Sequence, residues 1–112
     1  MMKNKILVSL CFLFIGCKDI SQGKQYAYSE TEKRLSIIKD FVDGKVLDST
    51  LRRAEAVVFM EKLTKIESES PFIAEAKLNP TKGDYDKWSK WYEQNKPRLY
   101  WDKRNKKVSV NK

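Results

Sequence analysis

The longest helical pattern in the sequence covers residues 50–66, Thr-Leu-Arg-Arg-Ala-Glu-Ala-Val-Val-Phe-Met-Glu-Lys-Leu-Thr-Lys-Ile. On a helix of about 100° per residue its apolar side chains form two stripes, separated by Glu55 and Lys62. The first stripe holds Leu51, Ala54 and Val58, and the second holds Phe59, Leu63 and Ile66. A helix with two apolar stripes contacts two neighbours, so we expect it to be the central element. Asp48 or Ser49 can cap its start.

An earlier helix is predicted over about residues 30–43. Ser29 and Glu32 have the spacing of a capping box, in which each side chain accepts a hydrogen bond from the other residue's backbone amide. Apolar residues then recur at helical spacing: Leu35, Ile38, Phe41 and Val42. Residues 19–28 lack this periodicity, so we expect them to form a flexible tether.

The connection after the central helix is expected to be long. Residues 67–83 contain three breakers of regular structure, at Pro71, Pro80 and Gly83. One turn of helix at residues 73–77 is the regular structure expected within it. A connection of this length is uncommon in a compact domain, and it is either functional or wrapped on the core.

A third helix is predicted over residues 85–94, with Asp84 as its cap. Lys96-Pro97 would end it, because the residue before a proline avoids the helical region. Two β-prone runs follow, at residues 99–101 and 107–110, and they predict a hairpin. The expected fold is therefore mainly α, a small three-helix domain with a C-terminal β-hairpin.

Aromatic side chains are concentrated in residues 85–101. They are Tyr85, Trp88, Trp91, Tyr92, Tyr100 and Trp101. Each aromatic can bury roughly 150 to 250 Å², and a small domain needs such large side chains for its core. We therefore interpret them as core residues of the domain over residues 29–112. A stacking platform for sugar rings or acyl chains is the alternative, and the interleaved lysines would also suit a nucleic acid by charge.

The sequence offers little enzyme chemistry. It contains no histidine, which excludes Ser-His and Cys-His nucleophile systems and the usual zinc sites. A lysine follows Ser21, Ser36 and Ser109 at the third position, but the companion motifs of Ser-Lys enzymes are missing. Asp84-Tyr85-Asp86 lacks the glycine and distal glutamate of a calcium loop. We expect no catalytic residue, no metal site and no cofactor.

The N-terminal segment has the pattern of an export signal. Residues 1–5 carry Lys3 and Lys5, and residues 6–15 are apolar except for Ser9. An apolar helix of that length reaches roughly 15 Å, half of a hydrocarbon core of about 30 Å, which is the length of a secretory signal rather than of a membrane span. An uncleaved anchor or another kind of signal, and a buried core helix, are the alternatives.

Phe14-Ile15-Gly16-Cys17 closes this segment and resembles the lipobox of bacterial lipoproteins, with Phe14 where that family prefers leucine. The resemblance implies that residues 1–16 are a removed signal peptide and that Cys17 carries the lipid, palmitate among its acyl chains. Residues 17–28 would then be the lipidated cysteine and its tether. The implied location is the cell envelope, in a membrane-anchored form that faces the periplasm or lies in the outer membrane.

A second resemblance concerns the tryptophan segment. Trp88-Ser-Lys-Trp-Tyr-Glu-Gln-Asn95, followed by Leu99-Tyr-Trp-Asp102, is similar to a C-terminal segment of small exported bacterial proteins of unknown function. Some of those proteins are helical-repeat proteins. The similarity covers about a fifth of the chain and implies no catalytic residue.

Positive charge is concentrated in the last third of the chain. The formal net charge is +8; residues 18–78 are neutral overall, and residues 79–112 carry 10 basic and 4 acidic side chains. The predicted hairpin turn holds the candidate contact residues Lys103, Arg104, Lys106 and Lys107. They are either a solvated surface or a footprint for an anionic partner. Because export separates the protein from nucleic acids, an anionic envelope component, lipid headgroups or an acidic protein fits better.

These patterns predict a non-enzymatic, lipid-anchored envelope protein that acts as a binding or interaction module. An inhibitor or immunity-type lipoprotein, which blocks a toxin or an envelope hydrolase, is the alternative. A small carboxylate-dependent enzyme, using acids such as Glu55 and Glu61, is a third hypothesis.

Overall fold

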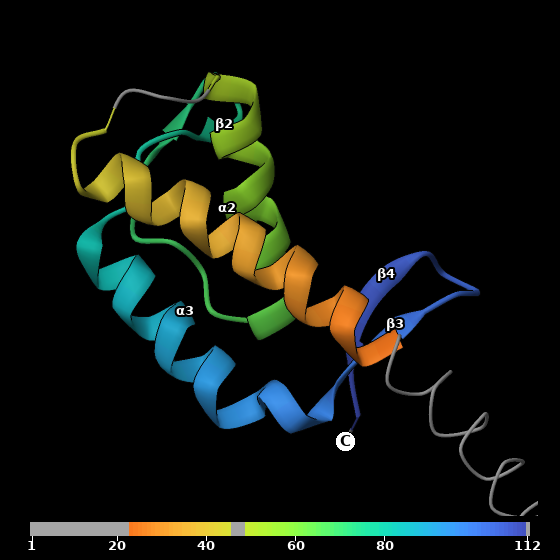
Figure 1. Cartoon of the computed structure of the whole chain (residues 1–112). Helices are drawn as coiled ribbons and strands as arrows, with labels where there is room; N and C mark the ends of the chain where they lie inside the picture. Colours follow the sequence, from red (N-terminus) through yellow and green to blue (C-terminus); the bar gives the residue numbers. More distant parts are fainter. Residues whose placement is uncertain (1–22, 46–48, 112) are drawn as a thin grey trace, which may run out of the picture.

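The computed structural model describes residues 23–45 and 49–111. An N-terminal helix over residues 23–42 comes first. It is followed by α2 (Thr50–Thr64), β1 (Phe72–Ile73), β2 (Ala76–Lys77), α3 (Lys82–Asn95), the 3-10 helix η1 (Lys96–Arg98), β3 (Leu99–Asp102) and β4 (Lys107–Val110). The N-terminal helix, α2 and α3 pack against one another, and the β3–β4 hairpin lies beside the start of the N-terminal helix (Figure 1). The predicted mainly α fold with a C-terminal hairpin is confirmed.

The N-terminal helix starts earlier than expected. Residues 23–28, which we expected in a tether, are helical, and Ala27 is fully buried. The buried face continues along one side of the helix through Thr31, Leu35 and Ile38. The hydroxyl of Thr31 donates to the carbonyl oxygen of Ala27 at 2.8 Å, so a polar residue fills a core position. The part of the expected tether before residue 23 lies outside the described residues.

The expected capping box at Ser29 is therefore wrong. Ser29 is exposed and lies within the helix, where the backbone amides already have helical partners. The first turns of this helix were missed because their buried positions hold Ala27 and Thr31. Neither residue is as apolar as leucine or isoleucine, so the helical periodicity is weak there.

Helix α2 begins as predicted, with Ser49 as its cap. The Ser49 side chain accepts a hydrogen bond from the amide of Arg52 at 3.1 Å. The helix ends at Thr64 rather than Ile66, because Lys65 takes a left-handed conformation with φ 63°. Helix α2 packs against α3, β2 and β4, which confirms its central place.

The two-stripe prediction for α2 is only partly correct. The fully or nearly fully buried residues of the helix are Ala56, Val57, Met60 and Thr64. Phe59 and Leu63 of the second stripe are half-buried against the core. Leu51 of the first stripe is 68% exposed and Val58 is 45% exposed, so this stripe is largely solvent-accessible.

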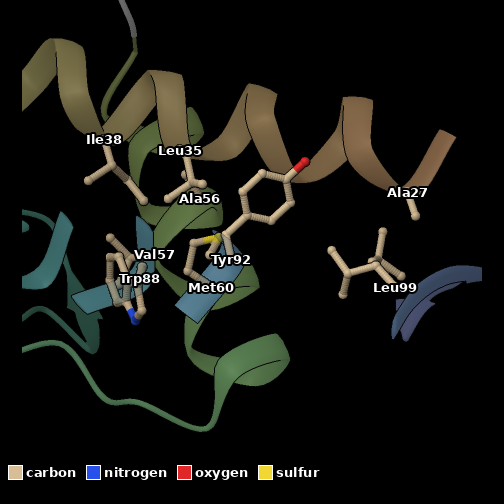
Figure 2. Close-up of a cluster of buried hydrophobic side chains, with 10 residues drawn as sticks. Ala27, Leu35, Ile38, Ala56, Val57, Met60, Trp88, Tyr92 and Leu99 are labelled. Atoms are coloured by element: carbon tan, nitrogen blue, oxygen red, sulfur yellow. The ribbon is translucent and has the colours of Figure 1, made fainter. Parts of the chain in front are cut away.

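The core draws side chains from every long element, as Figure 2 shows. Its members are Ala27, Leu35, Ile38, Ala56, Val57, Met60, Trp88, Tyr92, Leu99 and Val108. Trp88 is fully buried, and its indole Nε1 donates to the carbonyl oxygen of Ile66 at 3.0 Å. Trp91 and Trp101 are partly buried and pack against the same cluster. The aromatic segment is thus mainly a packing element.

The connection between α2 and α3 contains a β-hairpin instead of the expected helical turn. Strand β1 pairs with β2 in antiparallel register, with Ile73 opposite Ala76. The two turn residues, Ala74 and Glu75, have φ values of 49° and 70°. Two consecutive left-handed residues match the twist of a two-residue hairpin turn, although asparagine and glycine are the usual residues there.

Helix α3 starts at Lys82, three residues before the predicted start. Thr81 is the cap, so the predicted cap at Asp84 is wrong; Asp84 is instead the third helical residue of a capping box. The Thr81 hydroxyl accepts from the Asp84 amide at 3.0 Å, and a carboxylate oxygen of Asp84 accepts from the Thr81 amide at 3.0 Å. Helix α3 ends at Asn95, but Lys96 keeps a helical conformation, with φ −49° and ψ −46°, so the expectation that it avoids this region is wrong. The chain continues through η1 into the predicted hairpin of β3 and β4, which is confirmed.

Candidate functional site

The turn between β3 and β4 presents four cationic side chains to solvent. Lys103, Arg104, Lys106 and Lys107 are all exposed, and we call them the hairpin tip. None of the four forms an ion pair with any residue in the described ranges. The structure therefore places the four predicted contact residues together, at one accessible point.

Asp102 organises the hairpin tip. Its Oδ1 accepts hydrogen bonds from the amides of Arg104 at 3.1 Å and Asn105 at 3.2 Å, and its Oδ2 accepts from Nδ2 of Asn105 at 2.8 Å. These hydrogen bonds, the one from the Asn105 side chain above all, lower the pKa of the Asp102 carboxyl, and the charge of Lys107 adds to the effect. The ionised carboxylate thus holds the turn with its cations outward at neutral pH.

The start of the N-terminal helix lies against this hairpin (Figure 1). The rings of Tyr26 and Trp101 meet edge to face, with centroids 4.6 Å apart and planes at 72°. The Nζ atom of Lys24 donates to the carbonyl oxygen of Pro97 at 3.0 Å. Residues 75 positions apart in the chain therefore share one end of the domain.

This shared end carries a concentration of positive charge. Residues 96–107 contain six basic side chains and one acidic side chain. We call the following set the basic end: Lys24, Lys96, Arg98 and the hairpin tip. Apart from Lys24, which is half-buried, its members are exposed, so an approaching anionic surface meets cations from three segments of the chain.

Aromatic rings lie among these cations. The ammonium group of Lys96 lies 4.9 Å from the ring centroid of Tyr28 and 5.7 Å from that of Tyr92. The hydroxyl of Tyr92 donates to Oε2 of Glu32 at 2.8 Å. Burial, followed by this hydrogen bond and the charge of Glu32, raises the pKa of Tyr92 well above its usual range. Tyr92 therefore stays neutral and acts as a structural link.

A buried polar cluster surrounds Asp84 at the start of α3. Asp84 is 1% exposed. Its Oδ1 accepts from the Glu69 amide at 2.9 Å, and its Oδ2 accepts from the Ser68 hydroxyl and the Thr81 amide. Burial alone would raise the pKa of Asp84, but these hydrogen bonds outweigh it and lower the pKa. Both carboxylate oxygens already accept hydrogen bonds from other residues of the protein, so Asp84 stabilises the fold rather than binding an external ligand.

The acids considered for catalysis are engaged in separate contacts. Oε2 of Glu61 lies 2.9 Å from Nζ of Lys77 and accepts from the Ser68 amide at 2.8 Å, which ties the β1–β2 hairpin to α2. Glu55 lies 3.9 Å from a guanidinium nitrogen of Arg34. Nothing in these contacts arranges the two acids around a reacting group.

A shallow groove of about 370 Å³ lies between the N-terminal helix and α2. It is lined by Arg34, Ala54, Glu55, Val58 and Phe59. The guanidinium group of Arg34 lies 5.3 Å from the ring centroid of Phe59. The groove is open and mostly apolar, and its one cation already contacts Glu30 at 3.8 Å.

Comparisons with known proteins add no family. No protein-family model matches the chain, and no curated protein or solved structure matches it significantly. Within residues 23–45 and 49–111, no group of three or more acidic, cysteine or histidine side chains could hold a metal ion. In the same residues, no helix combines the length and the hydropathy needed to cross a membrane.

Sequence reasoning identified the hairpin tip and missed Tyr26 and Lys24. Both residues fell in the segment expected to be a tether. The spacing of Ala27, Thr31 and Leu35, four residues apart each time, is the signal that could have placed Tyr26 and Lys24 on a helix.

Proposed function

We propose that this protein is a lipid-anchored binding module of the cell envelope, whose basic end contacts an anionic surface. In this proposal Cys17 carries the lipid, as its place at the end of a lipobox-like motif indicates. The protein has no catalytic role in the proposal; it acts by holding its hairpin tip against an anionic envelope component.

One observation supports the proposal most directly: the basic end is also the end at which the described chain begins. Cys17 precedes Gly23 by six residues, which span at most about 20 Å even when fully extended. The contacts of Tyr26 with Trp101 and of Lys24 with Pro97 hold that helix start against the hairpin and η1. A lipid on Cys17 would therefore keep the basic end near the membrane surface.

Electrostatic reasoning favours a membrane surface over a distant partner. Exposed charges are screened beyond about 8 Å at physiological salt, so the hairpin tip acts on what lies next to it. A basic residue near an anionic bilayer contributes about 1 kcal/mol, so the four tip residues would contribute on the order of 4 kcal/mol. That is weak for a free protein, but it is effective for one already tethered by its lipid.

The test uses the full-length chain, processed by cells and reconstituted into vesicles of phosphatidylglycerol or of phosphatidylcholine. Amide hydrogen exchange at residues 102–107 is expected to slow in phosphatidylglycerol vesicles at low salt, and to recover at high salt. Reversal of the four tip charges to glutamate should abolish the slowing.

A matched control changes the net charge equally on the helices. It replaces four exposed cations by glutamate: Lys33, Lys39, Arg52 and Lys62. This variant should keep the slowed exchange at the hairpin tip. Equal exchange of the wild-type tip in both kinds of vesicle would overturn the proposed contact.

A further inference from the structure

We propose that Tyr26 and Trp101 form an aromatic contact that seats the basic end at the headgroup level of an anionic bilayer. This inference rests on the proposed function, and it adds the orientation of the domain and the residues that enter the interface. The cations of the hairpin tip attract the domain to the anionic headgroups. The aromatic pair contacts the less polar part of the membrane interface, beneath the headgroups.

The two rings of the pair differ in how they are held and exposed. Trp101 lies on β3 opposite Val108, which is buried, and the indole is partly buried against the core. Tyr26 meets this ring edge to face and remains 48% exposed. The ring of Trp101 is thus held by the fold, and the tyrosine, which has an apolar ring and a hydroxyl group, is about half exposed to the surroundings.

The position of the pair matches the proposed membrane-facing end. Trp101 immediately precedes Asp102, the residue that organises the cationic turn. Tyr26 lies one helical turn after Gly23, the first described residue. The aromatic pair therefore lies between the hairpin tip and the point from which the chain leads back to Cys17.

The chemistry of this end favours a lipid surface as the occupant. Tyrosine and tryptophan are enriched at membrane interfaces because one side of each ring system is apolar and the other is polar. Lysine and arginine beside them neutralise anionic headgroups. An acidic protein would pair with the cations, but it would not provide the partly apolar environment that the exposed ring of Tyr26 favours.

Among the residues that the structure describes, one other aromatic residue, Phe72, is strongly exposed and provides a contrast. Phe72 is 71% exposed, but it lies on β1, away from the basic end. Lys77 already lies over its ring, with Nζ 5.1 Å from the centroid. Phe72 therefore serves as a control residue of similar size, more exposed than Tyr26, at the opposite end of the domain.

The experiment observes the three tryptophan indole N–H signals by NMR in the full-length protein, processed by cells and reconstituted into phosphatidylglycerol nanodiscs. Lipids with a paramagnetic label near the headgroup broaden the signals of groups that lie close to them. We expect Trp101 to be broadened strongly and Trp88 to be unaffected, since Trp88 is fully buried. Broadening of Trp101 should disappear at high salt.

Substitutions then separate the aromatic contact from the cationic one. Tyr26→Ser is expected to lower the ratio of docked to undocked protein by roughly tenfold. This is the loss expected when the apolar area of about half a tyrosine ring is no longer buried in the membrane interface. Tyr26→Phe should retain most of the docking, and Phe72→Ser should leave it unchanged. Thermal unfolding of each variant shows whether the fold is intact.

Failure of the aromatic contact and failure of the proposed function give different results in these experiments. If exchange at the hairpin tip slows on phosphatidylglycerol but Trp101 is no more broadened than Trp88, the aromatic inference is overturned and the proposed function stands. The same conclusion follows if Tyr26→Ser docks as well as the wild type. If the hairpin tip is unprotected and Trp101 is unbroadened, both proposals are overturned.

Discussion

The hydroxyl of Ser68 donates a hydrogen bond to the carboxylate of Asp84, 16 residues further along the chain. Because Asp84 also accepts from the amides of Glu69 and Thr81, one buried carboxylate joins the segment that follows α2 to the start of α3. The fold thus depends on the carboxylate of Asp84, and the hydrogen bonds that Asp84 accepts keep this group ionised.

Replacement of Asp84 by asparagine should destabilise the domain by about 1–3 kcal/mol at pH 7, because the amide group cannot accept all of these hydrogen bonds. Urea unfolding measures the loss. Asp86→Asn, at an exposed position of the same helix, should change stability little. An Asp84→Asn variant as stable as the wild type would show that the carboxylate is dispensable.

The pH dependence of stability should follow from the same group. The pKa of Asp84 is lower in the folded protein than its ordinary value of 3.8, so the folded state binds the proton less readily than the unfolded state does. Its stabilisation is present above about pH 4 and is lost as pH falls through the lowered pKa. Urea unfolding between pH 6 and pH 2 should show a steeper decline for the wild type than for Asp84→Asn, and parallel declines would contradict this.

Among the tryptophans, Trp88 should matter most for stability. Trp88→Ala removes a fully buried ring and its hydrogen bond to Ile66, so we expect a loss of about 3–5 kcal/mol. Trp91→Ala and Trp101→Ala remove partly exposed rings and should cost less. Denaturant unfolding of the three variants gives the order directly; a larger loss at Trp91 or Trp101 would contradict the assignment of Trp88 to the centre of the core.

The β1–β2 turn should become more stable when its residues suit its backbone. Both Ala74 and Glu75 have positive φ, so the replacement of the pair by Asn-Gly should stabilise the domain by about 1 kcal/mol. A higher melting temperature would report this. Ala76→Gly, on the adjacent strand, is the control and should lower the melting temperature. A lower melting temperature for the Asn-Gly variant would indicate that the turn has another conformation.

Lipidation at Cys17 is checked by metabolic labelling with palmitate. The wild type should incorporate label, and Cys17→Ser should not, leaving an unprocessed or released protein. Cys11→Ser is the matched control, because Cys11 lies within the expected signal peptide and its loss should leave labelling intact. Equal labelling of wild type and Cys17→Ser would exclude Cys17 as the modified residue.

Local signals explain which elements were predictable from the sequence. The cap of α2, predicted at Asp48 or Ser49 and found at Ser49, and the β-prone runs of the C-terminal hairpin depend on residues close together in the chain. The β1–β2 hairpin was not predicted, because Ala74-Glu75 is not a usual turn pair, and because the ion pair of Lys77 on β2 with Glu61 on α2 joins residues that are distant in the sequence.

Tertiary packing decided the remaining features. Leu51 is apolar and exposed whereas Thr64 is polar and buried, so hydropathy alone assigned part of the α2 surface wrongly. The cations of the hairpin tip were predictable because they adjoin one another in the sequence. The contact of Tyr26 with Trp101 was not, because only the folded chain brings these two distant segments together.

The two ends of the described chain are neighbours, and this affects how the protein should be handled. Lys24 bonds to the carbonyl oxygen of Pro97, and the Asn111 amide donates to that of Arg98, the next residue, at 2.9 Å. A fluorescent protein or affinity tag fused after the last residue would therefore sit beside Lys24 and Arg98, which belong to the basic end. Such a fusion would obstruct the surface whose binding is to be measured, so untagged protein or a removable tag is the appropriate material.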